Sequence, residues 1–274
     1  MDKKKLYGLI DEYWKDFCAC RNLDIILKQS VPIIWFGNLN EYEKSEKKII
    51  TVALNPSDRE FEYEGKFSFH RFPMLEGLNK HDSLSKADRD MLIKGYNQYF
   101  KNDYLSWFNT YEKIMGDSFP DGIKASYFEV GANRVIHIDY YTALATNQKW
   151  TYIGKNSKKT IKTNEEKKEE NRQKNIISES GRKLFTELME YLNPDIILFS
   201  ANDKARQEIL KVFKGGCTER INKMNPNNKH RLISYNASGK LFIFGSNDRF
   251  GPLAGIDEKD KWLKEVFDDY KSWE

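Results

Sequence analysis

Residues 48–54 read KIITVAL, a largely apolar run that stops at Asn55-Pro56-Ser57. A run of this kind is typical of a strand buried on both faces, as strands of a parallel sheet are. The proline stiffens the turn that follows and exposes the next backbone N–H groups. We therefore expect an α/β protein in which this strand belongs to the central sheet and polar residues mark its carboxyl end.

Strands and helices alternate along the rest of the chain. Apolar runs predict four further strands, at Val31–Phe36, Arg134–Tyr140, Asp195–Ser200 and Leu241–Phe244. Apolar residues at helical spacing predict helices over Leu6–Cys20, residues 82–116, Ser178–Leu192, Asn202–Phe213 and Ile256–Trp273. Gly215–Lys229 is polar and is predicted as a loop. Because no repeat or linker interrupts the pattern, it indicates a single α/β domain over residues 1–274 with a mostly parallel sheet.

Polar clusters follow four of these strands. Ligands of open α/β sheets bind beyond the carboxyl ends of the strands, so we expect a site where the four clusters converge. The clusters are Asn55-Pro56-Ser57, Asp139-Tyr140, Ser200-Ala201-Asn202 and Gly245-Ser246-Asn247.

The composition excludes several classes of protein. Apolar residues make up 39% of the 274 residues and charged residues 31%, which excludes collagen-like and low-complexity chains. Seventeen Phe, 15 Tyr and 6 Trp can build a core. No apolar run approaches the roughly 20 residues of a membrane span, and the basic N-terminal residues lack the apolar region of a signal peptide. With three Cys, an odd number, a disulfide scaffold is not expected. We expect a cytoplasmic protein without a membrane partner.

One segment holds the excess of positive charge. Lys155–Lys174 carries a net charge of +4, equal to the net charge of the whole chain, and it belongs to a charged insertion at about residues 154–177. Such a segment is either a solvated loop or exposed helix, or a basic arm that meets phosphates.

Familiar cofactor and metal motifs are missing. The chain has no phosphate-binding P-loop, no GxGxxG after a strand and no GxSxG elbow. Cys18, Cys20 and Cys217 lack metal-site spacing and suit ordinary semi-buried thiols. The four His are scattered. We therefore expect neither a metal nor a cofactor.

The turn after the first strand is followed by the aromatic stretch FEYEGKFSFHRF (61–72). An Asn at a strand end can hold a water molecule through its carboxamide. Aromatic rings can form a slot in which a nucleobase stacks. A common turn at Asn55 and a packing role for Phe67, Phe69 and Phe72 are the alternatives.

Together these stretches resemble the uracil-DNA glycosylase superfamily. VALNPSDREF (52–61) is similar to its first motif, in the branches with Asn before the Pro, and VIHIDYYTALATNQKW (135–150) to its second strand. PDIILFSANDKA (194–205) is similar to the third strand, and GSNDRFGPLAG (245–255) lies where the family has its last loop. The resemblance implies a three-layer α/β/α fold with a mostly parallel four-stranded sheet, and base excision from DNA.

Two positions depart from that resemblance. The last loop reads Gly-Ser-Asn where many members have His-Pro-Ser, so Ser246 or Asn247 would have to support the charge on the departing base. Asp139 stands where several branches use a base-reading Asn. An ionised carboxylate only accepts hydrogen bonds, which suits an exocyclic amine. We therefore expect an amine-bearing or modified base, such as a cytosine derivative, rather than plain uracil. A role for Asp139 as a cap or water ligand stays open.

The resemblance also implies a role for each candidate residue. Asn55 would hold the attacking water, with Asp58 as a second candidate for orienting it; a capping role for Asp58 is the alternative. Arg249 and Phe250 would wedge into the duplex as the nucleotide flips out, or form a surface ion pair and a packed ring. The catalytic candidates are Asn55, Asp58, Ser246 and Asn247. The base-binding candidates are Pro56, Ser57, Phe67, Phe69 and Asp139.

The sequence thus predicts a monomeric DNA glycosylase that leaves an abasic site and acts in base excision. It predicts no iron–sulfur cluster, because the three Cys cannot supply the family's four-Cys arrangement. Two alternatives remain: a hydrolase of small nucleosides or nucleotides, and a non-catalytic nucleic-acid-binding module of the same fold.

Overall fold

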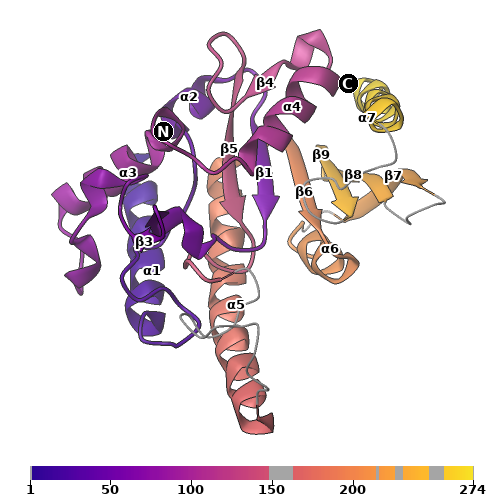
Figure 1. The fold of residues 1–274 in the computed structure, drawn as a ribbon. Helices are drawn as coiled ribbons and strands as arrows, with labels where there is room; N and C mark the ends of the chain where they lie inside the picture. Colours follow the sequence, from indigo (N-terminus) through magenta and orange to yellow (C-terminus); the bar gives the residue numbers. More distant parts are fainter. Residues whose placement is uncertain (1, 148–162, 214–215, 226–230, 247–255, 274) are drawn as a thin grey trace. The chain divides into compact units, whose positions relative to one another are not determined.

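The computed structural model describes residues 2–147, 163–213, 216–225, 231–246 and 256–273 (Figure 1). The chain forms two compact units. One, here called the helical unit, comprises Met1–Phe36, Leu54–Leu105 and Asp139–Leu192. The other, the sheet unit, comprises Gly37–Ala53, Ser106–Ile138 and Asn193–Glu274. Since each unit draws on three separate stretches of the chain, neither is a separable half of the sequence.

The sheet unit is built on a seven-stranded sheet in the order β4-β5-β1-β6-β9-β8-β7. β1 is parallel to β6, β6 to β9, and β4 to β5, while β8 and β7 run antiparallel at the far edge. The prediction of an α/β protein with a mostly parallel sheet is confirmed (Figure 1). The strands are β1 (Ile49–Ala53), β4 (Ala125–Ser126), β5 (Asn133–Asp139), β6 (Ile196–Ala201), β7 (Cys217–Met224), β8 (Arg231–Ala237) and β9 (Lys240–Ser246).

The four strands that end in polar clusters lie side by side as β5-β1-β6-β9. The register sets Ile49 of β1 opposite Ile196 of β6, and Ile196 opposite Leu241 of β9. These side chains are buried, which explains why continuous apolar runs form the inner strands.

Two predictions about strands were wrong. Residues 215–229 were predicted as a loop, yet Cys217–Met224 forms β7. Its polar sequence carries little strand propensity, so antiparallel pairing with β8 creates the strand. Val31–Phe36 was predicted as a strand, yet it forms none and is buried in the helical unit. There Ile33 N–H donates to Ala143 O at 2.8 Å, without a continuous ladder.

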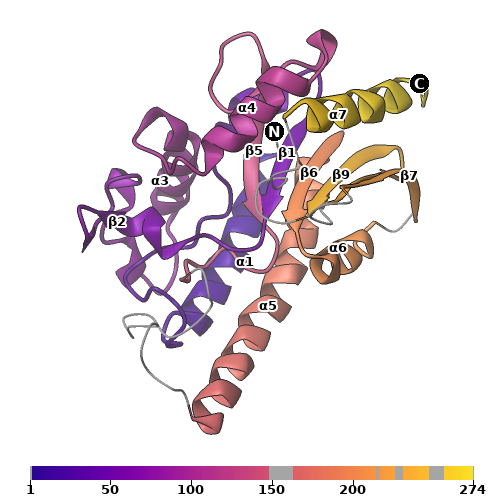
Figure 2. The same cartoon turned by 45° about the vertical axis from the view of Figure 1, so that its right-hand side comes forward.

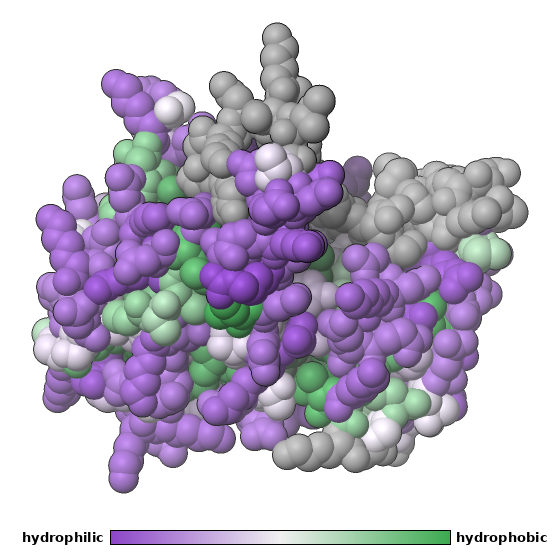
Figure 3. Space-filling model, turned by 90° about the horizontal axis from the view of Figure 1, so that it is seen from below, coloured by the Kyte–Doolittle hydropathy of each residue, from purple (hydrophilic) through white to green (hydrophobic). Residues whose placement is uncertain are grey.

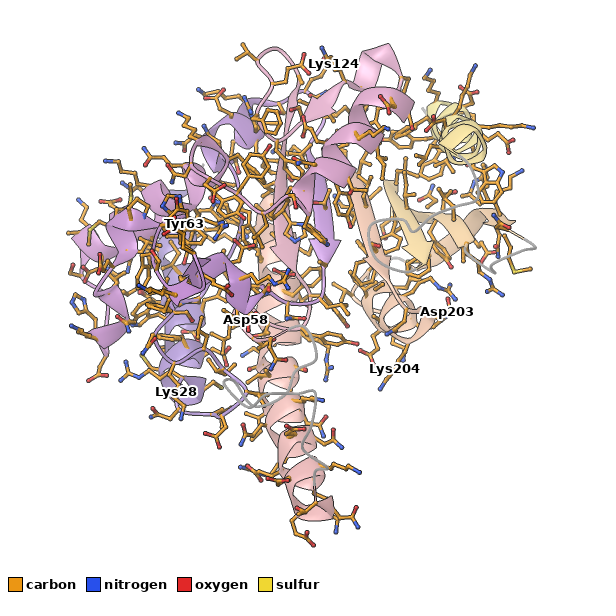
Figure 4. All side chains as sticks on the ribbon, viewed as in Figure 1. Lys28, Asp58, Tyr63, Lys124, Asp203 and Lys204 are labelled. Carbon is orange, nitrogen blue, oxygen red and sulfur yellow. The ribbon has the colours of Figure 1, made fainter. Side chains whose placement is uncertain are left out.

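In the described residues, the helices that accompany the sheet are α2 (Leu39–Lys44), α4 (Phe108–Ser118), α6 (Asp203–Leu210) and α7 (Ile256–Lys271). In α6, Asn202 is the N-cap, and its Oδ1 accepts a hydrogen bond from Ala205 N–H at 2.9 Å. Figure 4 shows Asp203 and Lys204 at the start of this helix. The predicted helices over residues 202–213 and 256–273 are confirmed.

The helical unit has three long helices: α1 (Lys3–Cys20), α3 (Lys86–Asn97) and α5 (Asn164–Leu192). Figures 1 and 2 show α1 alongside α5, and the two helices are in contact. α3 starts with a capping box between Ser85 and Asp88, as its sequence suggests. A hairpin and short 3₁₀ turns complete the elements: β2 (Glu62–Tyr63), β3 (Lys66–Phe67), η1 (Asp58–Phe61), η2 (Pro73–Leu75), η3 (Leu78–Lys80) and η4 (Tyr99–Lys101), with η5 (Asp121–Ile123) in the sheet unit.

The charged insertion is helical where the structure describes it. α5 begins at Asn164, so Lys167 and Lys174 lie on a helix, and Glu169 pairs with Arg172. Residues 148–162 lie outside the described residues. On the molecular face in Figure 3, hydrophilic residues predominate and hydrophobic ones form small patches. No described helix is both long and apolar enough to cross a bilayer.

Candidate functional site

The turn after β1 is hydrogen-bonded to the segment that follows β5. Tyr141 N–H donates to Leu54 O at 2.8 Å, and Thr146 N–H donates to Pro56 O at 3.1 Å. In return, Asp58 N–H donates to Thr146 O at 2.8 Å. All these residues belong to the helical unit. Backbone hydrogen bonds thus join the turn that holds the Asn55-Pro56-Ser57 cluster to the segment directly after the Asp139-Tyr140 cluster.

The Asn55 side chain is held in one orientation. Its Nδ2 donates to Thr146 Oγ1 at 2.8 Å and to Pro56 O at 3.2 Å. Thr146 is fully buried, and its hydroxyl donates its single proton to Asn147 O at 3.2 Å. The hydroxyl oxygen therefore accepts from Asn55. This arrangement is suited to positioning a water molecule, since a carboxamide is too weak a base to deprotonate one.

The capping role considered for Asp58 belongs to Ser57, which was predicted as a base-binding residue. Ser57 caps η1, because its Oγ accepts a hydrogen bond from Arg59 N–H at 3.2 Å. The Ser57 hydroxyl also lies 3.2 Å from Asp58 Oδ1, to which it donates. Burial raises the pKa of the half-buried Asp58, and the bond from Ser57 works in the opposite direction. Ser57, and not Asp58, is therefore the cap of this turn, and Figure 4 shows where Asp58 lies.

Asp139 ends β5 as a buried carboxylate, 7% exposed. Burial raises the pKa of Glu60 and of Tyr13, and the negative charge of Asp139 adds to the increase in both. Glu60 was missed in the sequence. The sequence around Glu60 gives little reason to expect a buried carboxyl group. Glu60 stands next to Phe61, but the nearby Glu62 and Glu64 are of the same residue type and are exposed.

Glu60 is 3% exposed, and Tyr99 O–H donates to its Oε2 at 2.7 Å. Burial raises the pKa of Glu60 to about 8. Arg71 supports the same turn, because its Nη1 donates to Arg59 O at 3.0 Å and to Glu62 O at 2.9 Å. The turn that follows Asn55-Pro56-Ser57 is therefore supported by buried polar side chains, those of Glu60 and Arg71.

The aromatic stretch forms a cluster at the β2–β3 hairpin. Phe69 packs edge-on against Phe61 and Phe67, with ring centroids 5.4 Å apart in both pairs. Phe67 is parallel to Phe61 at 6.2 Å. Phe67 is 40% exposed and Phe69 only 7%. The hairpin turn, Glu64-Gly65, has positive φ at both positions, which orients the two strands. Of the two predicted stacking rings, Phe67 has the accessible surface for a base.

Substitutions at these two rings should separate packing from binding. We expect Phe69→Ala to lower the free energy of unfolding by about 3–5 kcal/mol, because it removes a buried ring. Phe67→Ala should cost less stability, and if the ring stacks on a base as the sequence predicts, it should weaken binding of single-stranded DNA by about 1–3 kcal/mol per stacked base. Urea unfolding and fluorescence anisotropy measure the two effects. Equal stability losses would contradict the distinction.

The remaining predicted residues do not join this turn in the described structure. Asn247, Arg249 and Phe250 lie outside the described residues. Ser246 ends β9 in the sheet unit, with its backbone opposite Ala201. Asn202, in the third polar cluster, is used as the α6 cap.

Metal-binding groups are not gathered in the described ranges. No set of three His, Cys, Asp or Glu side chains there is arranged to hold a metal ion. Cys18, Cys20 and Cys217 are free thiols. Burial raises the pKa of Cys20 to about 12, so this thiol is protonated near neutral pH.

Comparison of the chain with protein-family models and with curated proteins found no match.

Proposed function

We propose that the protein is a DNA glycosylase that flips out a damaged or modified base and excises it by hydrolysis, leaving an abasic site. The observation that supports this most directly is the Asn55–Thr146 hydrogen bond of 2.8 Å. This bond fixes the Asn55 carboxamide, at the end of β1, to Thr146 in the segment that follows Asp139. A water-positioning amide, a base-reading carboxylate and an aromatic cluster then belong to one unit.

In the proposed reaction, the C1′–N bond breaks and its electron pair leaves with the base. An oxocarbenium-like sugar results, as in glycoside hydrolysis. Water adds to C1′ and loses a proton, which balances the base's negative charge. Asn55 holds this water and Asp58 orients it, so positioning supplies most of their effect. The backbone N–H group of Ser57 stabilises the charge on the base.

Asp139 reads the base in this proposal. As an ionised carboxylate it accepts hydrogen bonds and so favours an exocyclic amine. The expected substrate is an amine-bearing or modified base, such as a cytosine derivative. Phe67, the more accessible of the two predicted rings, stacks on the flipped base, and Arg249 and Phe250 fill the gap in the duplex.

The proposal extends to the finer features of the fold and the setting. It includes the three-layer α/β/α arrangement of the uracil-DNA glycosylase superfamily, with β5-β1-β6-β9 as the four-stranded core. The adjacency of these strands supports that assignment. DNA as the partner, a monomeric state and a cytoplasmic location belong to the same proposal.

End-labelled oligonucleotides carrying one test base each provide the experiment. The bases are uracil, cytosine, 5-substituted cytosines, hypoxanthine and mismatched thymine, and alkali cleaves any abasic site formed. We expect cleavage at an amine-bearing base by the wild type. Asp139→Asn should lower that rate by about 10–100-fold, the value of one base-reading pair, because the amide presents a donor where a lone pair was needed.

Other outcomes identify the alternatives. Excision of uracil without activity on cytosine-type bases would contradict the proposal that Asp139 recognises an exocyclic amine of the base. Release of bases from free nucleosides but not from DNA would favour a small-molecule hydrolase. Salt-dependent DNA binding without any base release would favour a binding module.

A further inference from the structure

The β2–β3 hairpin, which carries Phe67, is too short to hold its own position. Each strand has two residues, and Glu62 of β2 lies opposite Phe67 of β3. A two-stranded hairpin is at best marginally stable in water, so its placement depends on contacts from outside the two strands. Phe61 supplies one of them, because its carbonyl accepts a hydrogen bond from Ser68 N–H at 2.9 Å.

The Arg71 guanidinium joins this hairpin to the turn that precedes it. Its Nη1 donates to Arg59 O in η1 at 3.0 Å and to Glu62 O in β2 at 2.9 Å. One nitrogen atom thus bridges the segment that leads from the turn at residues 55–58 into the hairpin. The second acceptor belongs to the residue directly opposite Phe67. Because Arg71 is only 7% exposed, these two bonds are shielded from water.

Arg71 is itself held by the segment that follows η4. Asn102 Nδ2 donates to Arg71 O at 3.0 Å, and Arg71 Nη2 donates to Asp103 Oδ2 at 3.2 Å. The preceding residue, His70, has its Nε2 atom 3.8 Å from the same carboxylate oxygen. The His70 ring stacks on Tyr63 of β2, with ring centroids 4.1 Å apart. Two consecutive residues therefore connect Asp103 to β2, one through a backbone carbonyl and the other through a ring.

The shape of the guanidinium matters for this arrangement. Arg71 makes three hydrogen bonds from its two terminal nitrogens, to two backbone carbonyls and one carboxylate. A planar guanidinium fixes the directions of its donors, whereas a lysine ammonium is a point charge on a flexible stem. Arg71→Lys therefore keeps the positive charge but relaxes the positions of the oxygens that Arg71 joins.

We propose that Arg71 is a positioning residue for nucleic-acid binding: through Glu62 it holds the β2–β3 hairpin so that the exposed ring of Phe67 stacks on a base. This role rests on the proposed glycosylase function and concerns the binding of the base, not the breaking of the C1′–N bond. Phe67 touches the base, whereas Arg71 acts through Phe67, because the Arg71 side chain is enclosed and its Nη1 and Nη2 atoms bond protein oxygens.

A double-mutant cycle tests the role. Fluorescence anisotropy with a single-stranded oligonucleotide measures binding, and urea unfolding measures stability. We expect Phe67→Ala to weaken binding about tenfold and Arg71→Lys to weaken it by about three- to tenfold, since the hairpin keeps its other contacts. Substitutions that act through one contact are not additive. In the Phe67→Ala background, Arg71→Lys should therefore weaken binding no further, although it should still lower the free energy of unfolding.

Arg134→Lys is the matched control. Arg134 also donates from Nη1 to a backbone carbonyl, that of Tyr127, at 2.7 Å, but it lies in the sheet unit. This variant should leave DNA binding unchanged. Asp103→Ala reaches the same hairpin through a half-exposed side chain, so it serves if Arg71→Lys does not fold. It should weaken binding by about threefold, again only while the Phe67 ring is present.

Two results would overturn the role of Arg71. One is unchanged binding in both Arg71→Lys and Asp103→Ala. The other is an equal loss of binding with and without the Phe67 ring, which would show that Arg71 does not act through that ring. If the wild type binds DNA but excises no base, the proposed function fails, and the same cycle still decides the role of Arg71. If the wild type binds no DNA, both proposals fail.

Discussion

Asn55→Ala is expected to lower the rate of base excision by about 10²-fold or more, because the attacking water loses the group that positions it. The carboxamide cannot act as a strong base, so its contribution comes from orientation. That orientation is set by Thr146 Oγ1 at 2.8 Å and by Pro56 O at 3.2 Å. Single-turnover excision with the preferred oligonucleotide measures the loss.

Variants of Thr146 provide a graded control. Thr146→Val removes the hydroxyl that accepts from Asn55 and preserves the shape of the side chain. We expect a loss of about tenfold, smaller than for Asn55→Ala, because the amide keeps its bond to Pro56 O. Thr146→Ser restores the acceptor and should restore most of the rate. Urea unfolding should show a cost of about 1 kcal/mol for the lost hydrogen bond. A full excision rate in Asn55→Ala, with the fold intact, would contradict the assignment.

The second large effect concerns stability. Gly181 lies in α5 against the segment between Asp139 and Thr146. A Cβ atom at this position would lie 1.9 Å from Tyr141 O and 2.9 Å from Thr142 Cα. Neither backbone atom can yield without moving the segment. We expect Gly181→Ala to lower the free energy of unfolding by about 3 kcal/mol or more, although alanine is the better helix former by about 1 kcal/mol.

Gly8→Ala in α1 is the matched control. It makes the same change in a helix, but no atom lies within 4 Å of the added Cβ. This variant should gain about 0.5–1 kcal/mol from helix propensity alone. Opposite signs for the two variants in urea unfolding would establish the close contact between α5 and Tyr141. Equal gains would show that α5 does not press on this segment in solution.

Much of the candidate site was visible in the sequence because it follows strands. The apolar runs at residues 48–54 and 134–140 predicted strands, and those strands were confirmed with their ends at Ala53 and Asp139. Two polar clusters at strand ends could thus be expected together. Glu60 could not be found in this way, because its burial depends on Tyr99, Arg71 and the hairpin packing around it.

By itself, the sequence determined the α/β class, the inner strands, the helices α1 and α7 and the second half of α5, because these depend on local apolar patterns that burial on a sheet or helix face requires. Only the tertiary structure decided three other features. Cys217–Met224 became a strand by pairing with β8, and Val31–Phe36 was buried without pairing into a strand. Phe67 remained exposed while Phe69 was enclosed. The physical reason is common to all three: pairing and burial depend on which neighbours the folded chain supplies, and the residue types of the segment alone do not fix them.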